Sequence, residues 1–164
     1  MKDFRYILLI AVAGIFFLPA CVKENPFPPE PVITFSEYIS HGQDSADCLV
    51  AFKDGDGDIG ILSADTSSPN DLKMKYLYKD IDGIFKPFDA IDTTAVMDTL
   101  FYSYRVPNLT PDGQYKALDG EIRAKLRAAP IYYPGHHTVK FEITLRDRAG
   151  HVSNKVTTNE IVVP

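Results

Sequence analysis

The chain has 164 residues, of which 45% are hydrophobic and 24% are charged, and its net charge is −5. This length allows one domain with a core of ordinary size. The acidic balance argues against nucleic acid as a partner and against charge-driven binding to anionic membranes, because both attract basic patches. We therefore expect no nucleic-acid partner.

The first 20 residues have the layout of a secretory signal peptide. Lys2 and Arg5 precede an apolar run over 7–18, and the small residue Ala20 ends the segment. The run is 12 residues long, which is too short to cross a hydrocarbon core of roughly 30 Å. A buried N-terminal helix that ends at Pro19 is the alternative interpretation.

The stretch Leu18-Pro19-Ala20-Cys21 resembles the lipobox of bacterial lipoproteins, although Pro19 replaces the small residue, Ser or Thr usual there. The resemblance implies that the leader is cleaved before Cys21 and that Cys21 carries lipid. The predicted partner is thus a membrane, reached through the lipid on Cys21. The mature 144 residues carry a net charge of −6, because the leader holds two basic residues and one acidic residue.

Residues 21–31 are predicted to form the lipidated cysteine and a Pro-rich tether. Four prolines fall within 22–31, a composition that favours an extended, semi-rigid chain. Lys23-Glu24 partly resembles the surface-export signal of Bacteroidota-type lipoproteins; an ordinary solvated linker is the alternative. The predicted location is the cell envelope, with the protein anchored by lipid to the outer membrane; the orientations open to it are exposure at the cell surface and an inward-facing position.

Residues 32–164 read as an all-β domain. In 138–146 the apolar residues Val139, Phe141, Ile143 and Leu145 alternate with polar residues, which is typical of a half-buried strand. No segment has a sustained helical period, and 88–98 has room for no more than a single turn of helix. Gly-containing turn signals separate the predicted strands. The fold class predicted is a β-sandwich of about seven or eight strands, with strand patterns at 32–39, 46–53, 72–79, 84–88, 100–106, 122–128, 138–146 and 155–163.

Two motifs carry a resemblance to a known group. One is Phe52-Lys-Asp-Gly-Asp-Gly-Asp-Ile-Gly60, and the other is Leu145-Arg-Asp-Arg-Ala-Gly-His-Val-Ser-Asn154, in which His151 stands where Asn is usual. Residues 32–163 therefore resemble the immunoglobulin-like domain of small Bacteroidota-type surface lipoproteins with a DGDGDIG loop. The resemblance implies an immunoglobulin-like sandwich and no specific activity.

The best site candidate is the run Asp54-Gly-Asp-Gly-Asp58. Three carboxylates at alternate positions can surround a hard cation, and Ca²⁺ takes 6–8 oxygen ligands. Asp65 stands twelve positions into this loop, where an EF-hand has its last acid. Position 6 is Ile59 instead of Gly, however, and no helices flank the loop. The calcium site thus predicted comprises Asp54, Asp56, Asp58 and Asp65.

The alternative is a metal-free turn, because Asp-Gly repeats also form turns on their own. Three further acids are candidates to complete a cation shell, although sequence cannot place them beside Asp54; they are Asp80, Asp82 and Asp147.

Other chemistry-bearing residues favour structural roles. Cys48 lies on the apolar face of a predicted strand and is expected to be a small buried hydrophobe, with a catalytic thiol as the alternative. His136 and His137 point to opposite faces of an extended chain, so they cannot share one metal without a kink. Tyr132 and Tyr133 are the predicted exposed aromatic pair.

The sequence contains no G-x-S-x-G, H-E-x-x-H or phosphate-loop motif. The function expected is therefore non-enzymatic: an envelope module that binds an unidentified protein or glycan, or that serves a structural role. The alternative is a glycan-handling accessory protein or enzyme of the envelope. Turnover of a substrate from a glycan panel would favour that alternative.

Overall fold

The computed structural model describes residues 26–42, 44–91, 97–127 and 132–163. The predicted leader 1–20 and Cys21 lie outside the described residues. Within the described ranges, no helix has the length and apolar character needed to cross a bilayer. The secondary structure is a series of strands: β1 (Val32–Ser40), β2 (Ala46–Asp54), β3 (Leu72–Lys79), β4 (Phe85–Pro87), β5 (Asp89–Ile91), β6 (Met97–Thr99), β7 (Phe101–Tyr104), β8 (Leu118–Leu126), β9 (Thr138–Leu145), β10 (Val156–Thr157) and β11 (Ile161–Val162).

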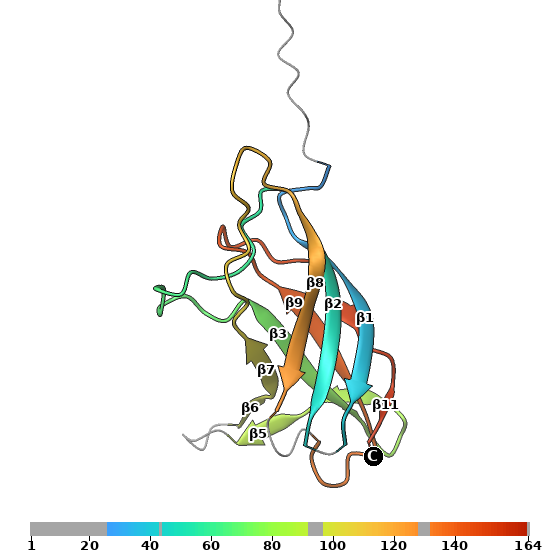
Figure 1. The fold of residues 1–164 in the computed structure, drawn as a ribbon. Helices are drawn as coiled ribbons and strands as arrows, with labels where there is room; N and C mark the ends of the chain where they lie inside the picture. Colours follow the sequence, from blue (N-terminus) through green and yellow to red (C-terminus); the bar gives the residue numbers. More distant parts are fainter. Residues whose placement is uncertain (1–25, 43, 92–96, 128–131, 164) are drawn as a thin grey trace, which may run out of the picture.

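Two antiparallel sheets face each other in a β-sandwich (Figure 1). One sheet has the order β1-β2-β8; the other has the order β10-β9-β3-β4, with β11 also paired to β9 and β7 also paired to β3. In immunoglobulin nomenclature, β1, β2 and β8 correspond to strands A, B and E, and β3, β9 and β10 correspond to C, F and G. The predicted all-β sandwich is confirmed, although the two sheets hold nine strands among the described residues instead of about seven or eight.

Two sheet-to-sheet crossovers lie at the end of the sandwich where β1 begins. The chain passes from β2 to β3 through residues 55–71 and from β7 to β8 through residues 105–117. Figure 1 places both connections at this end, together with the turn after β9. We call it the loop end. The β3–β4 hairpin lies at the opposite end.

The predicted strands agree closely with the observed ones where the alternation is regular. The predictions for 72–79 and 138–146 match β3 and β9 to within one residue. The prediction for 155–163 is wrong in one respect, since the segment forms two short strands that pair separately with β9. Within the segment 88–98, where the sequence allows a single turn of helix, residues 89–91 and 97–99 pair as β5 and β6 in a small antiparallel sheet; residues 92–96 lie outside the described residues.

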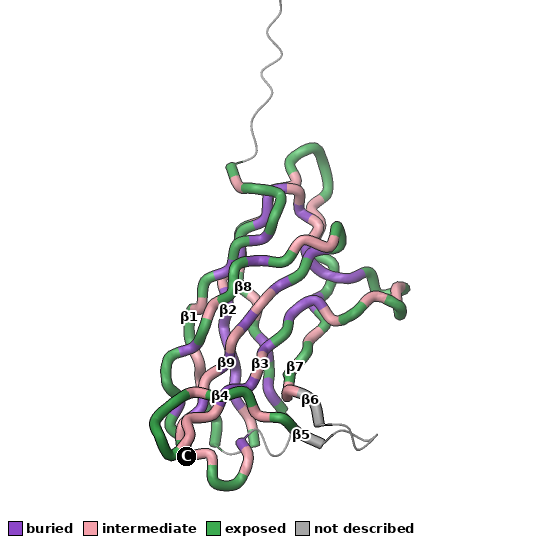
Figure 2. Tube along the Cα trace, turned by 180° about the vertical axis from the view of Figure 1, so that it is seen from behind, coloured by how far each residue is buried: buried purple, intermediate pink, exposed green. Residues whose placement is uncertain are grey.

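The core lies between the inward faces of β2, β3 and β9. Val50, Tyr76 and Phe141 are fully buried, and Figure 2 shows buried positions recurring along these strands. Cys48 is equally buried, and burial raises the pKa of its thiol to about 12. The thiol therefore behaves as the small hydrophobe that the sequence predicts.

The turn that follows β9 closes the sandwich by hydrogen bonds of its polar side chains. The Ser153 hydroxyl accepts from the backbone N–H of Leu145 at 3.0 Å. Asn154 then binds the outer edge of β1: its Oδ1 accepts from Ile33 N at 2.8 Å and its Nδ2 donates to Ile33 O at 2.9 Å. One side chain thus satisfies two groups of a strand in the other sheet, so this motif has a structural role.

We expect Asn154→Ala to destabilise the domain by about 1–2 kcal/mol, because it leaves the N–H and C=O of the buried Ile33 without partners. Urea denaturation measures the change as a lower midpoint at unchanged slope. Gln114→Ala, at an exposed loop position, is the control and should leave the midpoint unchanged. Equal midpoints for the two variants would show that Asn154 does not secure β1.

Candidate metal centre

Asp54, Asp56 and Asp58 cluster at the loop end, where Asp54 is the last residue of β2 and the other two follow in the loop. The alternation that turns Val50 and Phe52 into the core also turns Asp54 inward, and Asp54 has 0% exposure. Each aspartate offers one carboxylate oxygen, and these oxygens lie within 4.8 Å of one another. The spacing of these residues in the sequence therefore brings three carboxylates close together.

Each carboxylate of Asp54 and Asp58 uses one oxygen to hold the loop. The N–H of Asp58 donates to Oδ2 of Asp54 at 3.0 Å, and the N–H of Ala149 donates to Oδ2 of Asp58 at 2.8 Å. The other oxygens behave differently. Oδ1 of Asp54, Asp56 and Asp58 are all buried and accept no hydrogen bond within the described part of the chain. Buried polar atoms are normally paired, so three adjacent unpaired acceptors call for a ligand.

The electrostatics of the cluster point the same way. Burial raises the pKa of Asp54 to about 6, and the charges of Asp56 and Asp58 add to this effect. Burial also raises the pKa of Asp58, and the charges of Asp147 and Asp56 act in the same direction. The carboxylates thus carry repulsion that a bound cation would relieve.

The glycines of this loop are required by packing and not by the cation. A Cβ on Gly57 would lie 2.0 Å from Lys116 O, and Gly57 has a φ of +71°. A Cβ on Gly55 would lie 2.3 Å from Phe27 O. Backbone contacts therefore account for these glycines, whereas nothing in the packing accounts for the three unpaired aspartate oxygens.

The donor set suits a hard cation. Carboxylate oxygens, supplemented by backbone carbonyls, are the ligands that Ca²⁺ and Mg²⁺ prefer, and Ca²⁺ tolerates irregular geometry better than Mg²⁺ does. No thiol or imidazole belongs to the cluster found among the described residues. The three aspartates could hold a metal ion of this class.

Asp65, the fourth predicted ligand, lies apart from the cluster. Its carboxylate accepts from the backbone N–H groups of Ser67 and Ser68 at 2.9 and 3.0 Å, and from both serine hydroxyls. These hydrogen bonds, led by the Ser68 hydroxyl, lower the pKa of Asp65. Asp65 thus caps a turn within the β2–β3 connection, and the EF-hand spacing does not carry over to a loop that follows a strand.

The three further acids proposed for the shell separate in the fold. Asp80 pairs with Lys86 in the β3–β4 hairpin, and Asp82 is exposed there, at the end of the sandwich away from the cluster. Asp147 does lie near Asp58, whose pKa it raises. Its Oδ1 accepts from the N–H groups of Gly150 and His151, and its Oδ2 lies 2.8 Å from His151 Nδ1. Asp147 therefore adds charge to the site but has no unpaired oxygen.

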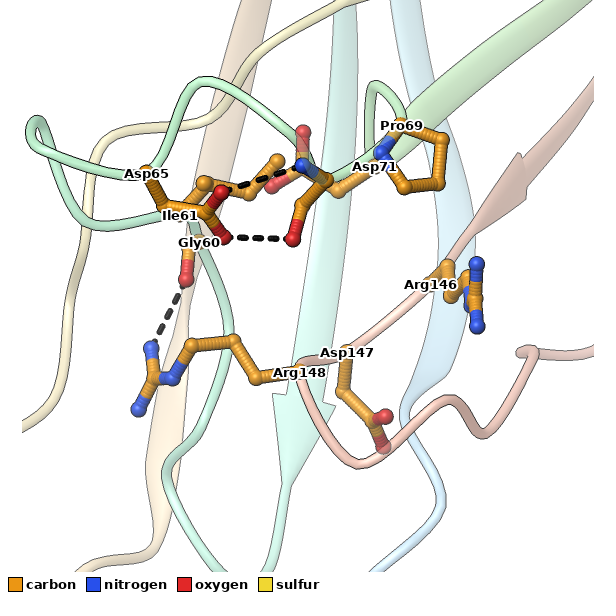
Figure 3. Close-up of a pocket in the computed structure, with 9 residues that line it drawn as sticks. Gly60, Ile61, Asp65, Pro69, Asp71, Arg146, Asp147 and Arg148 are labelled. Carbon is orange, nitrogen blue, oxygen red and sulfur yellow. Dashed lines mark hydrogen bonds between the residues drawn. The ribbon is translucent and has the colours of Figure 1, made fainter.

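A pocket of about 240 Å³ adjoins the loop on the side of the β2–β3 connection. Figure 3 shows Asp65 on one wall, and Asp147 on the other with its carboxylate directed away from Asp65. Arg148 donates to Gly60 O at 2.7 Å and so ties the turn after β9 to the segment that follows the loop 54–58. In the pocket wall, Oδ2 of Asp71 is also buried and finds no hydrogen-bond partner in the part of the chain that the structure describes. Nothing in its local sequence distinguishes Asp71 from the other loop acids.

The aromatic and histidine predictions are corrected in part. Tyr132 is buried, with 6% exposure, so Tyr132 and Tyr133 do not form an exposed pair. The hydroxyl of Tyr132 lies 2.8 Å from that of Tyr38. His136 stacks on Tyr78 with ring centroids 4.2 Å apart, whereas His137 is exposed. The two histidines thus have different environments, as the extended backbone predicts.

Metal-free protein should lose stability as the pH rises from 3.8 through about 6, in part through Asp54. Its folded pKa of about 6 exceeds the ordinary value of 3.8, so the folded state holds a proton that the unfolded state has released. The resulting stabilisation is present below pH 3.8 and is lost as the pH rises through about 6. In EDTA, the Tm of Asp54→Asn should therefore fall less over this range than that of the wild type. Asp112→Asn, at an exposed loop position, is the control, and parallel Tm profiles for wild type and Asp54→Asn would contradict the prediction.

No family model matches the chain, and comparisons with curated proteins and with solved structures found no match. The interpretation of the cluster rests on its geometry. Its distinguishing feature is that three neighbouring carboxylates each leave a buried oxygen unpaired within the described residues.

Proposed function

We propose that this protein is a lipid-anchored, non-enzymatic module of the cell envelope, a binding or structural domain whose immunoglobulin-like sandwich is stabilised by Ca²⁺ in the loop 54–58. The observation that carries the proposal is the set of three buried, unpaired Oδ1 atoms of Asp54, Asp56 and Asp58. Each of these atoms lost its hydration on folding, and the described residues supply no donor in its place. A divalent cation compensates all three at once.

Calcium fits this role better than a transition metal does. The ligands are carboxylate oxygens, and soft or borderline metals select thiolate and imidazole ligands. Extracellular calcium modules bind at roughly 10⁻⁴–10⁻³ M, which suits a domain exposed outside the cell. The cation is proposed to be structural, because it lies where three loops meet.

The anchor follows from the N-terminal sequence. The apolar run, the small residue Ala20 and the adjacent Cys21 support export, cleavage and lipidation. Location in the outer membrane, facing the cell surface, is part of the same proposal. A single acyl chain gives only marginal attachment, so stable anchoring takes more than one.

Millimolar CaCl₂ should raise the Tm of the soluble domain by about 2–5 °C relative to EDTA. Binding only to the folded state adds RT ln(1 + [L]/Kd), which is on the order of 1 kcal/mol at these affinities. Asp56→Asn should abolish the shift. Differential scanning calorimetry in EDTA, CaCl₂ and MgCl₂ measures it.

Asp65→Asn is the matched control, because Asp65 is an acid of the same connection that lies outside the cluster. Its baseline Tm should fall with the loss of its turn hydrogen bonds, while the calcium shift is retained. Identical melting of the wild type in all three solutions would instead establish the metal-free turn.

Cys21→Ser should prevent lipidation, so that the protein partitions into the aqueous phase of a detergent extraction. Wild-type protein should enter the detergent phase, because its acyl chains bury apolar surface there. Cys48→Ser controls for loss of a thiol as such and should still enter the detergent phase. A Cys21→Ser protein that remains with the detergent would place the anchor elsewhere.

A further inference from the structure

The last residues of the predicted tether, including Phe27 and Pro28, are part of the folded domain and contact the loop 54–58. The N–H of Gly55 donates to Pro28 O at 2.8 Å. Gly55 has no room for a side chain there, since a Cβ would lie 2.5 Å from that same oxygen. The Lys53 ammonium lies 5.0 Å from the centroid of the Phe27 ring. The tether is therefore fixed at the peptide between Asp54 and Asp56.

This contact limits how far the loop end can lie from the anchor. Phe27 is only six residues beyond Cys21 in the sequence. A fully extended chain spans at most about 3.3–3.6 Å per residue, so Phe27 lies within about 20 Å of Cys21. The far end of the sandwich is about 30 Å further along, because β2 has nine residues that rise about 3.3 Å each.

The surface of the loop end has side chains that suit a lipid interface. Four large apolar residues of its connections are exposed: Leu62, Leu109, Tyr115 and Val152. The exposed basic side chain of Arg146 also belongs to this end. Tyrosine and basic residues are typical anchors at the boundary between headgroups and water.

We propose that the docked tether holds the loop end against the bilayer that carries the lipid anchor, with the β3–β4 hairpin directed away from it. The orientation rests on the proposed function, because it requires the lipid on Cys21. The lipid surface is the partner of the loop end. The hairpin end, with the exposed Ile81 and Ile84, is then the part presented to the surroundings.

We expect the loop end to face the bilayer only when calcium is bound to the three aspartates. The uncompensated charges of Asp54, Asp56 and Asp58 lie beside the docked tether and are repelled by anionic headgroups. A bound cation removes that repulsion, and it orders the loop on which Pro28 rests. The loop end should therefore lie on an anionic bilayer in calcium and separate from it in EDTA.

Energy transfer to the membrane tests the orientation in the full-length lipidated protein. The protein is placed in nanodiscs that contain anionic phospholipid and a headgroup acceptor dye. A donor is attached at Gln114→Cys in the loop end or at Asp82→Cys in the hairpin; both positions are exposed, and the buried Cys48 remains unlabelled. In calcium, energy transfer from position 114 should exceed transfer from position 82, because position 82 should lie about 30 Å further from the membrane surface. In EDTA the difference should shrink.

A tether variant separates docking from anchoring. Replacing Phe27-Pro28-Pro29 by Gly-Ser-Gly removes the ring that lies near Lys53 and the prolines that fix the backbone presenting the carbonyl of residue 28 to Gly55. Cys21 and all three aspartates stay in place, so transfer from the two positions should become similar. Glu30→Gln, at an exposed tether position, is the control and should retain the difference. Equal transfer from both positions of the wild type in calcium overturns the proposal, as does an undiminished difference in the tether variant.

Failure of the proposed function gives different results. An unlipidated protein would not remain on the nanodiscs, and a protein that does not bind calcium would show no Tm shift. Equal transfer from a retained protein with a normal calcium shift would reject the orientation alone.

Discussion

The loop end of this sandwich is organised around the buried carboxylate of Asp54. Strand β2 carries Asp54 inward in register with Val50 and Phe52, so the side chain ends in the protein and not in water. One of its oxygens accepts from Asp58 N and sets the curl of the loop. The other is buried and unpaired among the described residues, and a cation held by the three aspartates could compensate its charge.

Three separate segments meet on this loop. The tether binds at Gly55, the turn after β9 binds Asp58 through Ala149, and Lys116 O from the β7–β8 connection lies too close to Gly57 for any side chain. All three contacts involve backbone atoms, and glycine permits the approach at two of them. The glycines and the aspartates of this loop therefore have different roles. The glycines leave room for the backbone of neighbouring segments, and the aspartates place three negative charges close together.

The same arrangement joins the proposed anchor to the proposed cation. A tether that contacted only the outer face of a sheet would leave the domain free to tilt, whereas one fixed beside Asp54 and Asp56 ties domain orientation to the loop. The core does not depend on this coupling, because Tyr76 and Phe141 are buried well within the sheets. Loss of the cation should therefore affect the loop end before it affects the sandwich.

Elements of the fold could be predicted from the sequence where the pattern that indicates them lies within the element itself. The alternation in 138–146 predicts β9 because a strand turns successive side chains to opposite faces whatever its partners are. The same logic placed Cys48 in the core. The short strands β5 and β6 were not predicted, because the segment 88–98 lacks a clear period and the two strands form through pairing with each other.

For the candidate site, the sequence by itself determined that Asp54, Asp56 and Asp58 share one loop, since residues two apart in a tight turn remain close. Only the tertiary structure decided which other groups join them. Asp65 is seven residues beyond Asp58 and caps a separate turn, whereas Asp147, from the far end of the chain, lies near Asp58 because the turn after β9 packs on this loop. The contact between the tether and this loop could not be predicted from the sequence either, because Pro28 O meets Gly55 N only once β1 has paired with β2. These contacts depend on strand pairing and crossover geometry, which no local pattern encodes.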